Sequence, residues 1–347
     1  MSTALLPARQ GIPLRVDRDA AAREWRNGFV RSATVTTLSL LRKAPAGEIE
    51  REIRSPVSPM KVGDYPGSSV VRLLTLAPKS AAAQLVPLAT VVDLKGISSF
   101  SFPLPTNFAA ASFVGEGQPI PVRQGVFAGM PVGPVKKLAL ISALSAELES
   151  ASGDVAQTII AHTLEVAVGK GLDAVLFSDD AATADAPAGL LFGVTPITPV
   201  AGGGFTAMSG DLRALIDSIA AAGIDTSGVV FVCAPSQALA IELTAGPHFA
   251  HRIIEASSLA AGTVIAIATS GLVISGDGAD PVIDTSKQAL LHFADPASQI
   301  STPGTPNVVS VPTVSTFQAD LLALRCIARI TWSAAPGSVA VVNGATW

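Results

Sequence analysis

The clearest pattern along the chain is a set of apolar residues that recur every four positions between residues 152 and 177. These residues, which share one helical face, are Ile160, Leu164, Val168, Leu172 and Leu176. Ser152 is a good N-cap residue and Asp154 favours the first turn, so the spacing predicts a helix of roughly 25 residues. Gly169 and Gly171 inside it each cost about 1 kcal/mol relative to Ala, so we expect close packing or a local irregularity there.

Helices and strands alternate in the pattern after this helix. Between residues 195 and 296 it predicts helices over 211–222 and 236–244, with strands over 229–233, 264–268 and 271–275. From residue 308 it predicts a strand, a bend, a long strand ending near Trp332 and a last short strand. A compact mixed α/β domain is therefore expected, and the absence of a fixed-period repeat excludes a solenoid or a propeller.

The first part of the chain has weaker patterns. It predicts one amphipathic helix over about 20–30, followed by sequence rich in Pro, Ser and Arg up to about residue 69, which is typical of an extended arm. Residues 100–105 (FSFPLP) alternate as in a strand, and residues 112–139 contain five Gly and four Pro between apolar ends. Because Gly and Pro punctuate strands, this segment predicts a long β-hairpin loop.

The composition is unusual for a solitary protein: 49% of the residues are hydrophobic and 14% are charged, whereas about 25% charged is usual. The longest apolar stretches, 159–177 and 263–274, are interrupted by charges or too short to span a membrane. Arginines precede any apolar run at the N-terminus, which argues against a secretory signal and favours the cytosol. Burial against other copies of the chain is the remaining explanation, because interface cores are depleted of charge.

Charge is distributed unevenly along the chain. Residues 1–62 hold eleven Lys/Arg and six Asp/Glu, a net of +5, which leaves −9 for the rest. The basic segment is expected to meet the body of a neighbouring copy or a nucleic acid, unless it is a solvated arm without a partner. The candidate basic contacts of this arm are Arg9, Arg15, Arg18, Arg23, Arg26 and Arg31. With one Tyr and three Trp, any binding of nucleic acid would be electrostatic and non-specific.

Sequence motifs for catalysis are missing, since no G-x-S-x-G, phosphate-loop or H-E-x-x-H motif occurs. The groups weighed as possible metal, acid/base or redox residues are His248 with His251, the aspartates Asp277, Asp280 and Asp284, the aspartates Asp179, Asp180 and Asp185, the lone His162 and His292, and Cys233 with Cys326. Each has an ordinary structural explanation as a turn, a packed ring or a buried thiol. No catalytic residue, cofactor or metal is therefore predicted.

Four segments occur in an order that resembles the tailed-phage major capsid family. SFVGEGQPIP (112–121) and PVKKLALISALSAELESASGDV (134–155) look like that family's transition from the extended loop to the spine helix. GLDAVLFSDDAATADAPAGLL (171–191) is similar to the end of the spine helix, and residues 315–347 resemble the final strands of the peripheral domain. The resemblance covers about residues 85–347.

This resemblance implies an α+β capsid fold that forms hexamers and pentamers of an icosahedral shell around double-stranded DNA. The implied parts are an extended N-terminal arm over 1–85, an extended hairpin loop (E-loop) over 99–142, a peripheral domain over 143–194 and 306–347, and an axial domain over 195–305. The E-loop residues expected to contact a neighbouring subunit are Phe113, Glu116, Ile120, Arg123, Val126, Phe127 and Met130. The shell would be assembled in the host bacterial cytoplasm and become part of the virion.

Two departures from the family pattern change what we expect about scaffolding proteins and covalent crosslinks. Only some 60–85 residues precede the shell-like part, which implies a separate scaffolding protein or none. No Lys lies between Lys95 and Lys136, so we expect a shell without covalent crosslinks. Portal, scaffolding and decoration proteins are possible partners, and a membrane is not.

Two other functions stay open on the sequence. An encapsulin-like compartment shares the fold but would enclose an enzyme as cargo, which the content of purified particles would show. An α/β enzyme with an unrecognised site would instead be a monomer with a deep polar pocket.

Overall fold

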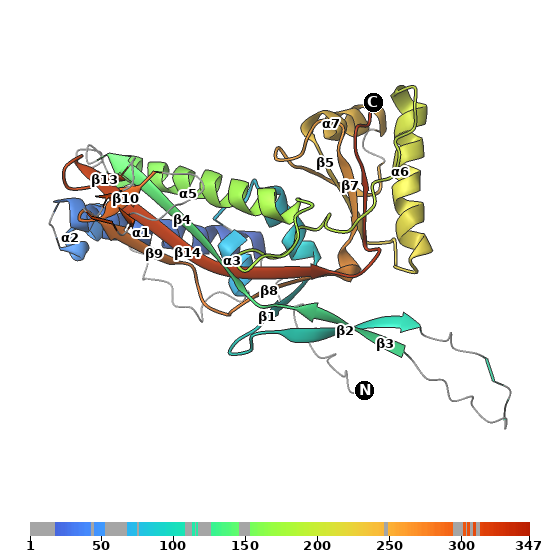
Figure 1. Ribbon diagram of the computed structural model, residues 1–347, viewed down its shortest axis with the longest axis horizontal. Helices are drawn as coiled ribbons and strands as arrows, with labels where there is room; N and C mark the ends of the chain where they lie inside the picture. Colours follow the sequence, from blue (N-terminus) through green and yellow to red (C-terminus); the bar gives the residue numbers. More distant parts are fainter. Residues whose placement is uncertain are drawn as a thin grey trace, which may run out of the picture.

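The computed structural model describes residues 18–42, 45–52, 68–74, 76–107, 113–114, 116, 126–145, 153–245, 249–293, 301–302, 304–305, 308–309 and 313–347. They form two main β-sheets with helices packed on them, and a two-stranded hairpin that leaves the body (Figure 1). Both kinds of element contribute to the core, which confirms the predicted α+β class.

The longer sheet is built around a strand of fourteen residues, β14 (Leu321–Ala334). The strands that join it are β4 (Lys136–Ser145) on one side, β8 (Leu272–Gly276) and β9 (Val282–Ser286) on the other, and β1 (Thr90–Asp93), which pairs with β8 in parallel. Side chains alternate between the two faces of a strand. The buried side chains from Leu322 to Trp332 at even positions therefore share one face of β14, and helices cover this face.

Two long helices, α1 (Arg18–Arg42) and α5 (Gly153–Leu176), lie side by side over this sheet (Figure 1). Helix α5 buries the five residues that the four-residue spacing predicted. A Cβ atom on Gly169 would lie 3.2 Å from Ser80 Cβ and 3.4 Å from Ala77 Cβ, which confirms close packing at that glycine. The shorter helices of this part are α2 (Ala46–Glu52), α3 (Ser69–Leu74), α4 (Ala81–Leu85) and the 3₁₀ turn η2 (Val86–Leu88).

The second sheet has the order β15 (Val339–Val342), β7 (Val264–Ala268), β5 (Val229–Cys233) and β6 (Arg252–Glu255). Its central strands are buried on both faces, which explains their uninterrupted apolar sequence. One face, which includes Phe231, packs under α6 (Gly204–Ala221) and α7 (Pro235–Ala245). The other face, which includes Val230 and Val232, joins the main hydrophobic core with the end of α5.

The hairpin consists of β2 (Phe100–Asn107) and β3 (Val126–Val132). Its base is fixed to the body because Met130 and Val132 pack with Leu94, Val273 and Ala335. Beyond this base the two strands run away from both sheets (Figure 1). The remaining elements are the 3₁₀ turn η5 (Thr269–Gly271) and two short ladders, β10 (Leu290–His292) with β13 (Thr313–Ser315), and β11 (Ser301–Thr302) with β12 (Val308–Val309).

Several boundaries differ from those expected. Residues 18–52 and 69–88 are largely helical and pack on the body, so an extended arm over 1–85 is wrong for these parts. The paired hairpin ends at Val132, and β4 belongs to the longer sheet although the E-loop was expected to reach residue 142. Strands β8 and β9 also belong to the longer sheet, whereas β15 belongs to the second one, so the chain crosses between the two units three times.

Candidate functional site

Several of the residues weighed for catalysis or metal binding have structural partners. Asp277 Oδ2 lies 2.9 Å from Arg329 Nη1, and Asp284 accepts hydrogen bonds from Arg325. The rings of His251 and Phe231 pack edge to face, and Nδ1 of His292 lies 3.0 Å from Thr313 Oγ1. No group of three or more His, Cys, Asp or Glu side chains converges as a metal site within the described ranges; His248 falls outside them.

The acidic loop after α5 is also an ordinary turn region. Asp179, Asp180 and Asp185 are exposed, and His162 is exposed on α5. The loop is held by the ammonium of Lys136, which donates to the carbonyl oxygens of Thr183 (3.2 Å) and Ala184 (2.7 Å).

Both cysteines are buried and reduced, as the sequence predicted. Burial raises the pKa of Cys233 to about 12 and that of Cys326 to about 11. Because the thiolate is the reactive form, both thiols are inert at neutral pH.

Two buried carboxylates fasten elements of the fold. Asp173 on α5 accepts hydrogen bonds from Ser80 Oγ (2.9 Å) and from the backbone N–H groups of Ala81 (3.1 Å) and Ala82 (2.8 Å), so it caps the first turn of α4. Asp211 on α6 accepts from Val200 N–H and from the indole N–H of Trp347, each at 2.7 Å. Both carboxylates therefore hold distant segments of the chain together.

A half-buried ion pair joins the two long helices. Arg26 Nη2 on α1 lies 2.8 Å from Glu165 Oε2 on α5, and Lys79 Nζ lies 3.7 Å from the other oxygen of Glu165. A groove of about 480 Å³ runs beside this pair, and its lining includes Asn27, Thr158 and His162. The groove is therefore polar and charged.

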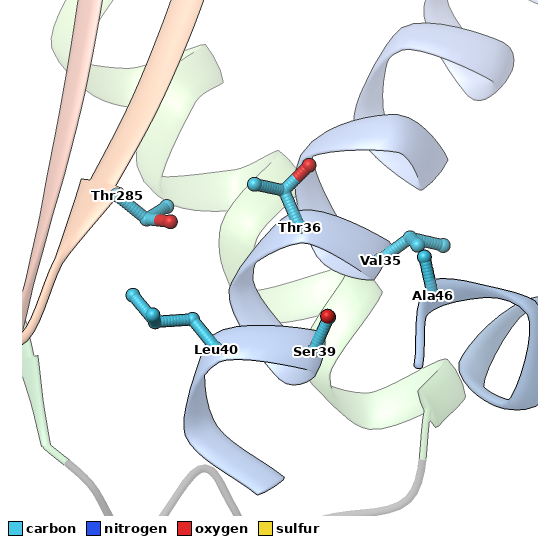
Figure 2. A pocket seen from close by; sticks show the side chains of 6 residues that line it. All are labelled: Val35, Thr36, Ser39, Leu40, Ala46 and Thr285. Carbon is cyan, nitrogen blue, oxygen red and sulfur yellow. The ribbon is translucent and has the colours of Figure 1, made fainter. Parts of the chain in front are cut away.

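A second groove, of about 530 Å³, lies at the far end of α1. Its lining comes from α1, the start of α2 and β9, and consists of Val35, Thr36, Ser39, Leu40, Ala46 and Thr285 (Figure 2). None of these side chains is charged. We call it the α1–α2–β9 groove.

Several sets of large apolar side chains are exposed among the described residues. On the hairpin tip, Phe113 is fully exposed. The other exposed sets are Val155, Ile159 and Val166 on the outer face of α5, Phe205, Leu239 and Leu243 on α6 and α7, and Leu290, Phe293 and Phe317 beside β10 and β13. Contiguous exposed apolar surface is characteristic of sites that bind other proteins.

Comparisons with known proteins identify the family. The sequence model described as "Phage capsid family" matches residues 76–331, more than half of the chain. The chain belongs to the phage capsid family. This result confirms the resemblance to tailed-phage major capsid proteins, and it identifies a capsid shell protein, which is a structural protein of the virion. A search of curated proteins found no match.

Solved structures show that the capsid protein has the same fold as distant phage proteins. It is similar to structures from Mycobacterium phage Bobi (TM-score 0.54, 16% identity, 86% of this chain and 98% of that chain) and Mycobacterium phage Adephagia (0.53, 17%, 75% and 89%). A structure from Microbacterium phage Oxtober96 is also similar (0.50, 14%, 84% and 95%). Within the described residues, no helix is long and apolar enough to cross a bilayer.

The predicted hairpin contacts lie in different environments. Phe113 and Glu116 are exposed near the tip, and Val126 and Phe127 belong to β3, while Ile120 and Arg123 lie outside the described residues. Met130 is only 4% exposed because its own chain buries it at the hairpin base. It has little surface left for a neighbour, so it stabilises the hairpin's attachment instead.

The predicted basic contacts are less available than expected. Arg9 and Arg15 lie outside the described residues, and Arg18 and Arg23 lie in the first turns of α1. Arg26 pairs with Glu165 of its own chain, and Arg31 is partly buried on α1. The acidic partner of Arg26 is therefore the chain's own spine helix.

Sequence reasoning missed the outer face of α5 as a candidate contact surface of the capsid protein. Val155, Ile159 and Val166 are spaced by four and seven residues, so they share a face that differs from the core face. A second apolar stripe on one helix is the signal that could have revealed this surface.

Proposed function

We propose that this capsid protein assembles into hexamers and pentamers of an icosahedral shell that encloses double-stranded DNA, with each hairpin lying on a neighbouring subunit. The observation that supports this proposal is the hairpin β2–β3: its base is packed on the body, while Phe113 near its tip is fully exposed. A side chain that no part of its own chain covers gains about 2–3 kcal/mol by burial in a neighbour.

The parts of the fold have corresponding roles in this proposal. The longer sheet with α1 and α5 is the peripheral domain, and the second sheet with α6 and α7 is the axial domain at the centre of each capsomer. The exposed apolar faces of α5 and α7 are further subunit contacts. The DNA is held by confinement and non-specific contacts, and portal, scaffolding and decoration proteins complete the particle.

The hairpin's role can be tested by removing residues 110–123, which leaves β2 and β3 intact. The variant should keep the far-UV circular dichroism of the wild type but form no closed particles by negative-stain electron microscopy. Normal particles would contradict the proposal.

The content of wild-type particles distinguishes a phage head from an encapsulin-like compartment. Nuclease-protected double-stranded DNA in particles from infected or induced cells supports a phage head. A protein cargo without DNA would instead support an encapsulin-like compartment.

A further inference from the structure

We infer that the α1–α2–β9 groove of one subunit receives Phe113 from the hairpin of a second copy. The inference rests on the proposed assembly and names the surface that the hairpin tip occupies. It comes from the match between a fully exposed aromatic side chain and a groove whose described lining residues carry no charge.

The lining of the groove suits an aromatic side chain. Leu40 is partly exposed at its edge, and Val35 lies in its wall. Thr36 Oγ1 already donates to Ser32 O (2.9 Å), and Figure 2 shows its methyl group on the side of Thr285 and Leu40. An entering ring therefore meets the side chains of Val35 and Leu40 and the Thr36 methyl group, beside the hydroxyl groups of Ser39 and Thr285.

The polar groove between α1 and α5 is a poorer site for the same residue. An apolar ring entering it would remove water from the Arg26–Glu165 ion pair, and desolvating charges without a new polar partner is costly. Of the two grooves, the uncharged one is favoured.

Charges beside the two surfaces are compatible with this contact. Along the chain, Glu116 follows Phe113 by three residues, and Lys287, which already interacts within its own chain, follows Thr285 by two. Asp284, next to Thr285, is already paired with Arg325. Its charge is therefore compensated and does not repel Glu116.

The two surfaces lie at different ends of the chain. Helix α2 and the neighbouring end of α1 are at one end of the long axis, whereas the hairpin points toward the other end (Figure 1). A chain therefore offers its tip to one neighbour and its groove to another. Such a head-to-tail contact closes into a ring when the rotation between copies permits it, as a capsomer requires.

A cysteine pair tests this contact in assembled particles. The variant Phe113→Cys with Thr285→Cys should form intermolecular disulfides under mild diamide oxidation, because facing residues reach the Cα separation of roughly 4.4–6.8 Å that a disulfide needs. The native Cys233 and Cys326 do not interfere, since their thiols are buried with raised pKa values. The expected product on a non-reducing gel is a ladder of multimers, because each copy donates one tip and receives one.

The matched control is Phe113→Cys with Asn27→Cys, which places the second thiol in the charged groove. This pair should give no ladder. A ladder with Asn27→Cys and none with Thr285→Cys would overturn the inference while leaving hairpin docking intact. No ladder with either pair, or a disulfide within one chain, would overturn it as well.

A substitution without cysteines provides an independent measurement. Phe113→Ala should raise the protein concentration for half-maximal assembly at least roughly tenfold. Leu40→Ala in the groove should also reduce assembly, and the effect of the double variant should differ from the sum of the two single effects. Additive effects would contradict a direct contact. If the wild type itself forms no particles, the proposed function fails and not only this inference.

Discussion

Helix α1 and the hairpin β2–β3 were both expected to reach out to neighbours, but α1 packs on its own chain, whereas the hairpin extends from the body. Helix α1 packs on α5 and β9 and buries one face, which comprises Val30, Ala33, Thr34, Thr37 and Leu38. These positions have the i, i+3, i+4, i+7, i+8 spacing of a core-facing helix. The hairpin has Pro and Gly, which do not suit a helix interior, and instead pairs alternating apolar residues across two strands, as in Phe102 with Met130.

This difference shows what decides whether an apolar segment is covered by its own chain. A segment that forms a helix can bury a whole stripe against one long neighbour, here α5. A two-stranded hairpin is marginally stable alone, so it needs packing on another surface. The base of this hairpin finds that surface in its own chain, and in the proposed assembly another copy provides it for the tip.

The sharpest test of the comparison is loss of a large side chain from each region. Leu38→Ala should lower the free energy of unfolding by about 2–5 kcal/mol, because Leu38 is fully buried between α1 and the body. Phe113→Ala should change it by less than about 0.5 kcal/mol, since nothing in the chain covers that ring. Urea titration of unassembled subunits by circular dichroism measures both.

Leu40→Ala is the matched control on the same helix. Its side chain is 38% exposed, so the loss should stay below about 1 kcal/mol. If Leu38→Ala has the same urea midpoint of unfolding as the wild type, α1 does not pack on the body and the expected extended arm is correct.

A smaller effect is expected from the ion pair that holds α1 on α5. Arg26→Met should cost about 1 kcal/mol, because the pair is only partly shielded from solvent and salt (24% and 15% side-chain exposure). Glu165→Gln should cost a similar amount, and a double-mutant cycle should show coupling that weakens in high salt.

Lys79→Met is the control for this pair. Lys79 Nζ is 3.7 Å from Glu165 and its side chain is largely exposed, so its loss should cost less than about 0.5 kcal/mol. Equal losses for Arg26 and Lys79 would mean that the charge of Glu165, and not the Arg26 geometry, matters.

The sequence predicted the elements whose buried faces are purely apolar. Helix α5 and strands β5 and β7 have uninterrupted or regularly spaced apolar residues, and their bounds were predicted within a residue or two. It did not predict which strands share a sheet. Strand β15 pairs with β7, and β8 with β14, through contacts between distant segments that local periodicity does not encode.

The candidate surfaces were predicted only in part for a similar reason. Phe113 and Glu116 stand out because they lie in a Gly/Pro-rich segment that cannot cover them. Val155, Ile159 and Val166 look like core residues in a sequence, since apolar residues on a helix do not reveal which face the body covers. Only the packing of α5 shows that this face is exposed.

The prediction of α1 ended too early because its buried face continues through threonines. Thr34 and Thr37 are both fully buried, and a hydroxyl can be buried in a helix when it bonds to the carbonyl one turn earlier. Thr34 Oγ1 does so with Val30 O at 2.8 Å. Sequence patterns count such residues as polar and therefore place them in solvent.

The two threonines make the last and smallest test of α1. Thr37 Oγ1 is buried without a hydrogen-bond partner among the described residues, so Thr37→Val, which keeps the shape, should raise the free energy of unfolding by about 1 kcal/mol. Thr34→Val should gain less, because it gives up the bond to Val30. Thermal unfolding of the two variants measures the difference. A lower free energy of unfolding for Thr37→Val would contradict this expectation. It would mean that water reaches the Thr37 hydroxyl, and that this face of α1 is exposed to solvent like the hairpin tip.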